Sequence, residues 1–273
     1  METKAFFLDM DGTLLNNQKE ITLENRTAIQ SALTMGHRII ISSGRTLNSI
    51  AALAKRLNLD NPGCYWIACN GAAIYDCGQK RVLLRRNLPM ISLYALFDEA
   101  KRRELYIQTY DEDGVLVEVG NDTAMTERYC AETLMQYRVI SDVRRDVVKE
   151  PEKALIIDYS GREKTEPMRQ WIVTALAGQA DSYYSSAYYL EVVAAGVDKG
   201  RALADVCGFL GIPIRNAVAV GDEANDITML RTAGQGVAMA NAQAEVKAAA
   251  DFITERDNNH SGVAEIIEQV LRT

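Results

Sequence analysis

Two aspartates one residue apart are the first residues in this sequence whose types and spacing suggest chemistry. Asp9 and Asp11 directly follow the apolar residues 5–8, and a Gly-Thr pair comes next. Neighbouring carboxylates repel each other, and a hard cation such as Mg²⁺, which binds carboxylate oxygens while keeping several waters, relieves that repulsion. Because Asp-Gly is also a common turn pair, an ordinary turn is the alternative. A third acid close to the pair would favour a metal site.

Further acids follow another apolar run near the other end of the chain. Asp222 comes directly after residues 217–221, and Asp226 lies four residues later, about one helical turn along the same face. We expect Asp222 to face Asp9 across the crevice of a sheet, where both could bind one metal ion. Glu223 and Asp226 could instead complement the positive end of a helix, and for Glu223 we favour this structural interpretation.

A lysine and a serine-glycine loop offer groups that bind anions. Asp198 is a plausible N-cap, which places Lys199 in the first turn of a helix, where the helix dipole disfavours a cation. A nearby anion would compensate, although a surface lysine also tolerates this small cost. The loop Ser-Ser-Gly-Arg at 42–45 presents hydroxyls and backbone N–H groups that could bind a phosphate. Loops of small polar residues are also frequent without any ligand.

Short apolar runs alternating with helical patterns must position these residues. In residues 4–75 and again after residue 197, apolar runs of strand length alternate with segments of helical periodicity. This alternation indicates a doubly wound, mostly parallel Rossmann-like α/β sheet covered on both faces. Ligands of such sheets bind beyond the carboxyl ends of the strands, although every strand must also meet water through polar residues. The polar residues that follow the expected strands are Asp9, Ser42 with Ser43, Asn70, Asp222 and Asn241.

The pattern changes between these two parts of the chain. Residues 105–119 predict an antiparallel hairpin with Asp-Gly in its turn, and residues 182–193 predict another. The segment also contains one further expected strand at 153–160. Three helices are expected at 91–103, 122–137 and 164–177. We therefore expect an inserted α+β cap domain at 82–190 between the two segments of a core domain, 1–81 and 191–273.

The composition limits the partners and the compartment. The 273 residues have a formal net charge of −7, which opposes binding to nucleic acid or to an anionic membrane. The five cysteines are odd in number and show no CxxC spacing, so a reducing cytoplasm is expected. We expect no leader, because the sequence starts with the strand-like residues 4–8 and without a basic region followed by a long apolar stretch. We expect no membrane span, because no apolar run reaches the roughly 18 residues that a span requires. The sequence does not indicate an oligomeric state.

Taken together, the motifs resemble those of the haloacid dehalogenase-like phosphatases, in the same order along the chain: D-M-D-G-T at 9–13, S-S-G-R at 42–45, D-K-G at 198–200 and G-D-E-A-N-D at 221–226. Residues 69–76, 236–242 and 258–267 are similar to the Cof-type branch, which has a type IIB cap between the second and third motifs. The cap is matched by position and by its strand and helix pattern alone. One departure is Ala240, where the family often has Gly, whereas Asn241 is retained.

The resemblance implies a role for each matching residue. Asp9 would be the nucleophile that forms an aspartyl-phosphate, while its other oxygen binds Mg²⁺. Asp11 would be the general acid and base, and its backbone carbonyl would also reach the metal. Asp222 would be a further metal ligand. Lys199 would neutralise negative charge on the phosphoryl group and on Asp9.

The other matching residues would bind the substrate phosphate or order the site. The phosphate-binding residues implied by the resemblance are Thr13, Ser43, Gly44 and Asn225. Asp226 would be either a metal ligand or a residue that orients the metal's waters or Lys199. Arg45 belongs to the loop motif, but no separate catalytic step is assigned to it.

The sequence therefore predicts a Mg²⁺-dependent phosphatase for small phosphorylated metabolites, with sugar phosphates favoured over pyridoxal phosphate and flavin mononucleotide. A mobile cap would favour a small substrate over a phosphoprotein, with hinges near 79–83 and 188–193. The alternatives are a phosphotransferase or phosphomutase that uses the same phosphoenzyme, and a non-catalytic protein that binds a phosphorylated metabolite. Several cap residues could contact substrate, although solvation and sheet packing explain them equally well: Arg85, Arg86, Arg144, Arg145, Tyr183, Tyr184, Tyr188 and Tyr189.

Overall fold

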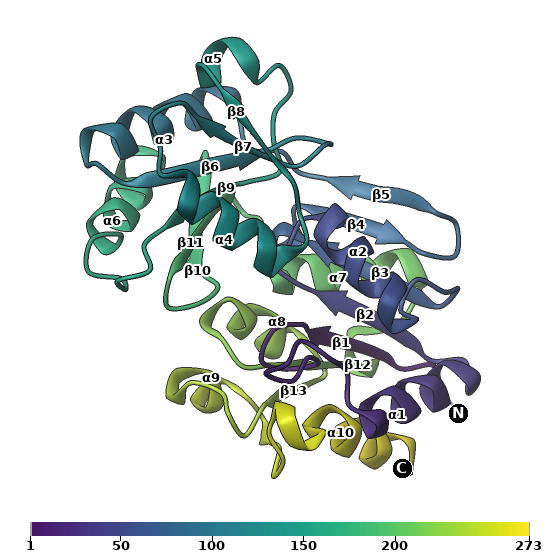
Figure 1. Cartoon of the computed structure of the whole chain (residues 1–273). Helices are drawn as coiled ribbons and strands as arrows, with labels where there is room; N and C mark the ends of the chain where they lie inside the picture. Colours follow the sequence, from purple (N-terminus) through teal and green to yellow (C-terminus); the bar gives the residue numbers. More distant parts are fainter. Residues whose placement is uncertain (1, 273) are drawn as a thin grey trace.

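The structure, a computed structural model, describes residues 2–272. Its larger sheet is made of β1 (Ala5–Asp9), β2 (Arg38–Ser42), β3 (Cys64–Ala68), β4 (Ala73–Asp76), β5 (Arg81–Arg85), β12 (Ala217–Gly221), β13 (Gln235–Ala238) and β14 (Phe252–Ile253). The strands lie in the order β14-β13-β12-β1-β2-β3-β4-β5 (Figure 1), and all neighbours are parallel except β3 with β4 and β4 with β5. The central strands β1, β3 and β12 are buried along their whole length, which explains their unbroken apolar sequences.

Helices and 3₁₀ turns connect these strands: α1 (Leu23–Thr34), α2 (Leu47–Leu57), η1 (Cys69–Gly71), α7 (Lys199–Leu210), η2 (Ile214–Asn216), η3 (Ala224–Asp226), α8 (Ile227–Thr232), α9 (Ala244–Ala249), η4 (Asn258–His260) and α10 (Gly262–Leu271). Right-handed crossovers place α1 and α2 on one face of the sheet, and α8 and α9 on the other. Helix α10 packs against α1, and α7 packs against α8. As the sequence predicts, Asp198 caps α7 by accepting a hydrogen bond from the Arg201 backbone N–H.

A second sheet and its helices are inserted between β5 and α7. The strands are β6 (Tyr106–Tyr110), β7 (Val115–Glu118), β8 (Tyr137–Ile140), β9 (Ala154–Ile157), β10 (Ala180–Tyr184) and β11 (Tyr189–Ala194), in the order β10-β11-β9-β6-β7-β8. The helices are α3 (Met90–Arg102), α4 (Thr123–Thr133), α5 (Val143–Asp146) and α6 (Glu166–Ala175). Figure 1 shows this inserted part, which we call the cap, lying over one end of the larger sheet.

Alternation along the cap strands separates the two faces of the cap sheet. In β9, Ala154 and Ile156 share a buried cluster with residues of α3 and α6, whereas Leu155 and Ile157 share another with Tyr129 of α4. Successive side chains of a strand point to opposite faces, so α3 and α6 cover one face and α4 covers the other. The face that carries α4 is the one from which the cap contacts the core, as described below.

The doubly wound, mostly parallel sheet with an inserted α+β unit is the fold class that the sequence predicts, and the predicted hairpins form as β6–β7 and β10–β11. The prediction that the helix starting near residue 122 continues to residue 137 is wrong for its last residues, because α4 ends at Thr133. Leu134 adopts a left-handed conformation that ends α4, and the following Tyr-Arg-Val-Ile forms β8, parallel to β7. This strand and α5 are missing from the sequence prediction.

The expected cap boundaries and hinges lie close to two strands. β5 belongs to the larger sheet through Arg85, and β11 belongs to the cap sheet through Ala194. The chain therefore passes between the two sheets after β5 and after β11, a few residues beyond the expected boundaries at 81/82 and 190/191. The expected hinges near 79–83 and 188–193 overlap these strands.

No helix within residues 2–272 is both long enough and apolar enough to cross a bilayer. The cysteines are buried free thiols. Their side chains serve as small apolar packing groups in the two parts of the molecule.

Candidate active site

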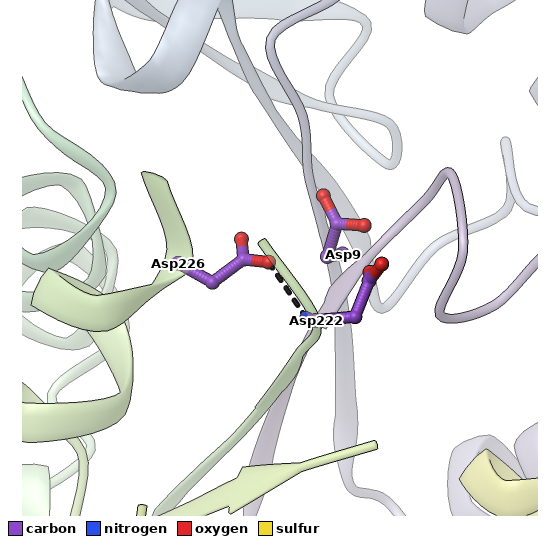
Figure 2. A group of neighbouring side chains, drawn as sticks. All are labelled: Asp9, Asp222 and Asp226. Atoms are coloured by element: carbon purple, nitrogen blue, oxygen red, sulfur yellow. Dashed lines mark hydrogen bonds between the residues drawn. The ribbon is translucent and has the colours of Figure 1, made fainter. Parts of the chain in front are cut away.

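The carboxyl ends of β12, β1, β2 and β3 lie along one edge of the larger sheet, because these neighbouring strands are parallel. Asp9 is the last residue of β1, the loop 42–45 begins at the end of β2, and Asp222 follows β12. Figure 2 shows the carboxylate groups of Asp9, Asp222 and Asp226 grouped at this edge. Sheet order thus brings together acids that are more than 200 residues apart in sequence.

The acidic cluster consists of Asp9, Asp222 and Asp226, all buried, with one oxygen of each within 4.8 Å of the others. The fully buried Lys199 donates through Nζ to Oδ1 of Asp9 and to Oδ1 of Asp226, each at 2.6 Å. Oδ2 of Asp226 accepts hydrogen bonds from the backbone N–H groups of Asp222 at 2.9 Å and Glu223 at 3.1 Å. Both oxygens of Asp226 are therefore engaged, and this residue holds Lys199 and the 222–226 turn in place.

The cluster carries more negative charge than Lys199 neutralises. Burial, and then the charge of Asp226, raise the pKa of Asp9 to about 7. Burial, and then the charge of Asp9, raise the pKa of Asp222 well above its usual value. Burial opposes the charge of Lys199, but Asp226 and Asp9 outweigh it and raise the pKa of the ammonium group. A further cation would therefore stabilise the fully ionised cluster.

The cluster also retains oxygen atoms for such a cation. Asp9 uses Oδ1 for Lys199, and Asp222 uses Oδ1 to accept a hydrogen bond from the Thr13 hydroxyl at 2.6 Å. Within residues 2–272, no donor forms a hydrogen bond to Oδ2 of Asp9 or of Asp222. Carboxylate oxygens are the protein ligands that Mg²⁺ prefers. The donor set fits Mg²⁺, with Asp9 and Asp222, rather than Asp226, as the side chains free to bind it.

Thr13 belongs to the site in a different way from the one expected. Its buried hydroxyl is committed to Asp222. This contact favours positioning of Asp222 over a direct side-chain contact with phosphate. Glu223, in contrast, has the structural role that the sequence favours, because it forms a reciprocal capping box with Asp226 at the start of η3.

The carboxylate of Asp11 is bound by two cations outside the acidic cluster. Arg45 donates to its two oxygens at 2.7 and 2.9 Å, and Lys19 donates to Oδ1 at 2.7 Å. Burial alone would raise the pKa of Asp11, but Arg45 and Lys19 outweigh burial and hold the pKa well below its usual range. A metal contact from Asp11 would therefore fall to its backbone carbonyl, as the resemblance implies. The sequence analysis assigns no catalytic step to Arg45. Its position in the loop motif, directly after Ser43 and Gly44, was a signal that it lies close to the site.

Ser43 and Gly44 form the loop after β2, directly beneath the cap. Ser43 is buried, and its hydroxyl accepts a hydrogen bond from the Arg45 backbone N–H at 3.2 Å. Above the loop, Lys153 of the cap donates to the Gly44 carbonyl oxygen at 2.8 Å and to Glu191 Oε2 at 2.7 Å. Lys153 and Glu191 are both buried, so the cap seals this side of the site with an ion pair that the sequence did not reveal.

Asn225 lies between the acidic cluster and the end of β3. It is buried, and its side-chain amide donates to Oδ1 of Asn70 at 2.9 Å. Asn241, another polar residue at a strand end, donates to the Gly12 carbonyl oxygen at 2.8 Å and so supports the turn that carries Asp9 and Asp11. Ala240 lies beside it and donates its backbone N–H to Thr254, outside the acidic cluster.

Most of the cap residues expected to contact substrate are bound to other parts of the protein. Arg144 pairs with Asp98, and Arg145 with Asp146. Tyr189 is the better candidate, because its hydroxyl donates to the carboxylate of Glu132, whose backbone carbonyl accepts a hydrogen bond from Arg45. The others make these contacts: Arg85 with Glu152, Arg86 with Asp205, Tyr184 with Thr165, Tyr188 with the Tyr159 ring, and Tyr183 with the core cluster.

The fold and the site define a capped, doubly wound α/β protein with a buried lysine among carboxylates at the sheet edge. The family model described as haloacid dehalogenase-like hydrolase matches residues 6–267. The chain belongs to this family and is an enzyme of the hydrolase class, as its motifs predict.

Similarity to individual proteins extends over almost the whole chain. The putative phosphatase YxeH of Bacillus subtilis is 31% identical, with 98% of each chain covered. The 5-amino-6-(5-phospho-D-ribitylamino)uracil phosphatase YcsE of the same organism is 30% identical, covering 98% of this chain and 95% of that protein. A crystal structure of a haloacid dehalogenase-like hydrolase from Bacteroides thetaiotaomicron is 33% identical, with a TM-score of 0.87 over 98% of this chain and all of the other.

Proposed function

We propose that this protein is a Mg²⁺-dependent phosphatase that hydrolyses small phosphorylated metabolites through an aspartyl-phosphate on Asp9. The observation that carries the proposal is the buried position of Lys199 between Asp9 and Asp226, with Asp222 beside them. A buried ammonium group next to a carboxylate at a strand end is suited to neutralising a phosphoryl group. The names of the relatives YxeH and YcsE, which are both phosphatases, support the same reaction class.

In the first step, one carboxylate oxygen of Asp9 attacks phosphorus while the other would hold the Mg²⁺ ion, and the bond between phosphorus and the leaving oxygen breaks. Protonated Asp11 gives its proton to that oxygen, so the product alcohol leaves neutral. Lys199, held by Asp226, offsets charge on the phosphoryl oxygens and on Oδ1 of Asp9. In the second step, Asp11 takes a proton from water, the water oxygen binds phosphorus, and the bond to Asp9 breaks to release phosphate.

Asp11 must leave its ion pair with Arg45 and Lys19 to carry out these transfers. In that pair its pKa is held low, which suits a base that has already lost its proton. The side chain is 36% exposed at the rim of the site, so an arriving substrate can reach it. We infer that the anionic substrate draws Arg45 away, so that the Asp11 carboxylate takes up a proton from solvent and then donates it to the leaving oxygen.

Asp9, Asp222 and the backbone carbonyl of Asp11 would hold the Mg²⁺ ion. When bound, the ion would supply positive charge that offsets the negative charge of the Asp9 carboxylate and of the phosphoryl group. Thr13 fixes the rotamer of Asp222 through its hydroxyl, and Asp226 fixes Lys199. The protein thus sets the geometry of each charged group before substrate arrives.

A small metabolite is the substrate class that the buried site supports. Asp9 is 7% exposed and Lys199 is fully buried, and the cap contacts the loop 42–45 through Lys153. A phosphorylated side chain on a folded protein would not reach this site. The phosphoribityl substrate in the name of YcsE is a phosphorylated polyol, which supports phosphates of sugars and related polyols as the first compounds to test.

The test is a screen of phosphorylated metabolites with purified protein and Mg²⁺, measuring both phosphate release and the organic product. We expect hydrolysis that chelation abolishes and that Asp9→Asn reduces at least about 1,000-fold, since the nucleophile is lost. Transfer of the phosphoryl group to an added sugar would instead identify a phosphotransferase. Binding without turnover by the wild-type protein would identify a metabolite-binding protein and contradict the proposal.

A further inference from the structure

Asn70 follows β3 and lies between two loops of the site. Its backbone N–H donates to the Ser43 carbonyl oxygen at 3.0 Å, and the Cys69 N–H donates to the Arg45 carbonyl oxygen at 2.9 Å. Its side-chain oxygen accepts the hydrogen bond from Asn225 at 2.9 Å. Asn70 therefore connects the loop at the end of β2 with the turn that follows β12.

The backbone here is strained. Cys69, Asn70 and Gly71 have φ values of 49°, 56° and 112°, three consecutive residues in a region that L side chains rarely adopt. Gly71 is required by close packing, because a Cβ atom there would lie 2.6 Å from the Asp198 carbonyl oxygen at the start of α7. Strain of this kind persists where the surroundings enforce it and is concentrated at functional sites.

The Asn70 side chain also carries an unused donor. Asn70 is 1% exposed, and its Nδ2 group has no hydrogen-bond partner within residues 2–272. Buried amide donors are nearly always paired, so each unpaired one requires a reason. A ligand that supplies an oxygen atom is such a reason.

The space beside this amide contains no side chain from the loop. A Cβ atom on Gly44 would lie 3.5 Å from Asn70 Nδ2 and 3.2 Å from Glu191 Oε1 of the cap. Gly44 thus lets the loop pass close to both the core amide and the cap carboxylate, which a side chain at this position would crowd. Ser43 and Asn225, to which Asn70 is bonded, are two of the residues for which the family resemblance implies phosphate binding.

We propose that Asn70 is a further catalytic residue, whose Nδ2 group donates a hydrogen bond to an oxygen of the phosphoryl group that is transferred. This inference rests on the proposed phosphatase function and adds a donor from the end of β3 to those from β2 and α7. The strained turn and the hydrogen bond from Asn225 to Oδ1 fix the orientation of the Asn70 side-chain amide, and Nδ2 points away from Asn225.

The test compares Asn70→Gly with Asn70→Asp. Glycine tolerates a φ of 56°, so Asn70→Gly removes the amide while sparing the backbone. We expect kcat/KM to fall about 10- to 100-fold, the range for a lost hydrogen bond to a charged group, and the inhibition constant of inorganic phosphate to rise by a similar factor. Asn70→Asp keeps the oxygen that Asn225 requires but replaces the donor with an acceptor, so the loss should be at least as large.

Asn58→Gly is the matched control. Asn58 is exposed, has a φ of 58° and ends α2 shortly before β3 begins, at the edge of the sheet opposite the acidic cluster, so this variant should keep wild-type kinetics. Wild-type inhibition by phosphate in both Asn70 variants, with wild-type turnover, would overturn the inference and leave the phosphatase function intact. Wild-type kcat/KM and phosphate inhibition in Asn70→Asp, with losses in Asn70→Gly, would also overturn the inference. That result would show that Asn70 acts only by holding Asn225. A wild-type protein without hydrolysis would instead reject the proposed function.

Discussion

At the scale of single residues, the site is built from charges that do not balance without an additional cation. Lys199 faces Asp9 and Asp226, while Asp222 has a hydroxyl for its partner. Acids with a raised pKa in the folded state bind more protons there than in the unfolded chain. These acids are therefore expected to lower the stability of the metal-free protein at neutral pH, and the proposed binding of Mg²⁺ would offset that cost.

The pH dependence of stability follows from these shifts. The pKa of Asp9 is about 7 in the folded protein and 3.8 in an unperturbed chain, and that of Asp222 is raised as well. Between about pH 4 and 7 the folded protein holds more protons, so the contribution of these acids to stability decreases as pH rises. We expect Mg²⁺ at 100 times its dissociation constant to add about 2.7 kcal/mol at pH 8, raising Tm by about 5–10 °C. At pH 5.5 protons compete with Mg²⁺ for the carboxylates. Mg²⁺ should therefore raise Tm by less, relative to the chelated sample, than it does at pH 8.

Asp222→Asn tests whether the charge of Asp222 causes the low stability of the metal-free protein and its response to Mg²⁺. The amide oxygen can still accept the Thr13 hydrogen bond, but one buried charge is removed from the cluster. In chelator at pH 8, Tm should rise by a few degrees, about 2–4 °C per kcal/mol, and added Mg²⁺ should have little further effect. The exposed Asp60→Asn is a matched charge control with wild-type behaviour. A full Mg²⁺ response in Asp222→Asn would exclude Asp222 as a metal ligand.

Sequence reasoning identified the acids and Lys199 because strand ends and helix starts leave clear residue patterns. It did not find the contacts that depend on side-chain rotamers. Nothing in the spacing indicates that Thr13 bonds to Asp222, that Arg45 binds Asp11, or that Asn70 meets Asn225. Each of these bonds joins segments that are brought together by the sheet.

At the scale of elements, a buried ion pair within the cap contacts the loop 42–45 of the core. Lys153 begins the turn into β9 and Glu191 lies in β11, and the ammonium group also reaches the Gly44 carbonyl oxygen. Lys153→Met leaves the Glu191 carboxylate buried without its ion-pair partner. Chemical denaturation should therefore show that the free energy of unfolding falls by about 3–5 kcal/mol. The double variant Lys153→Met with Glu191→Leu should recover most of that loss. Equal losses in the single and double variants would contradict this explanation, by showing that the loss comes from the contacts of Lys153 itself and not from an unpaired Glu191 charge.

The cap also shows where pattern reading fails for elements. The hairpins were predictable because alternation and an Asp-Gly turn are local signals. β8 was not, because it pairs with β7 in parallel across the whole of α4, and its Tyr137 and Val139 side chains are exposed. An exposed edge strand lacks the apolar alternation from which strands are recognised.

At the scale of the whole molecule, the buried active site requires that the cap and core separate during turnover. Besides Lys153, the cap is bound to the core by Asn48, which donates to the Glu112 carbonyl oxygen at 2.6 Å, and by Ser49, which donates to the Thr133 carbonyl oxygen at 2.7 Å. Arg162 of the cap also lies 3.9 Å from the carboxylate of Glu223, next to Asp222, and Asp9 is 7% exposed. Substrate entry and product release then depend on breaking these contacts, so opening of the cap sets an upper limit to kcat.

Covalent linkage of the two parts tests this dependence. Asn48 and Glu112 are exposed, whereas the native cysteines are buried, so a short bismaleimide should join Asn48→Cys to Glu112→Cys selectively. We expect kcat of the linked protein to fall at least about 10-fold, because gating by the cap would become slower than the chemical step. Asn48→Cys treated with the same reagent should keep its rate, which controls for modification alone. Wild-type turnover in the linked protein would mean that substrate reaches Asp9 without separation of the cap, and the small-molecule specificity would then have to come from a fixed channel.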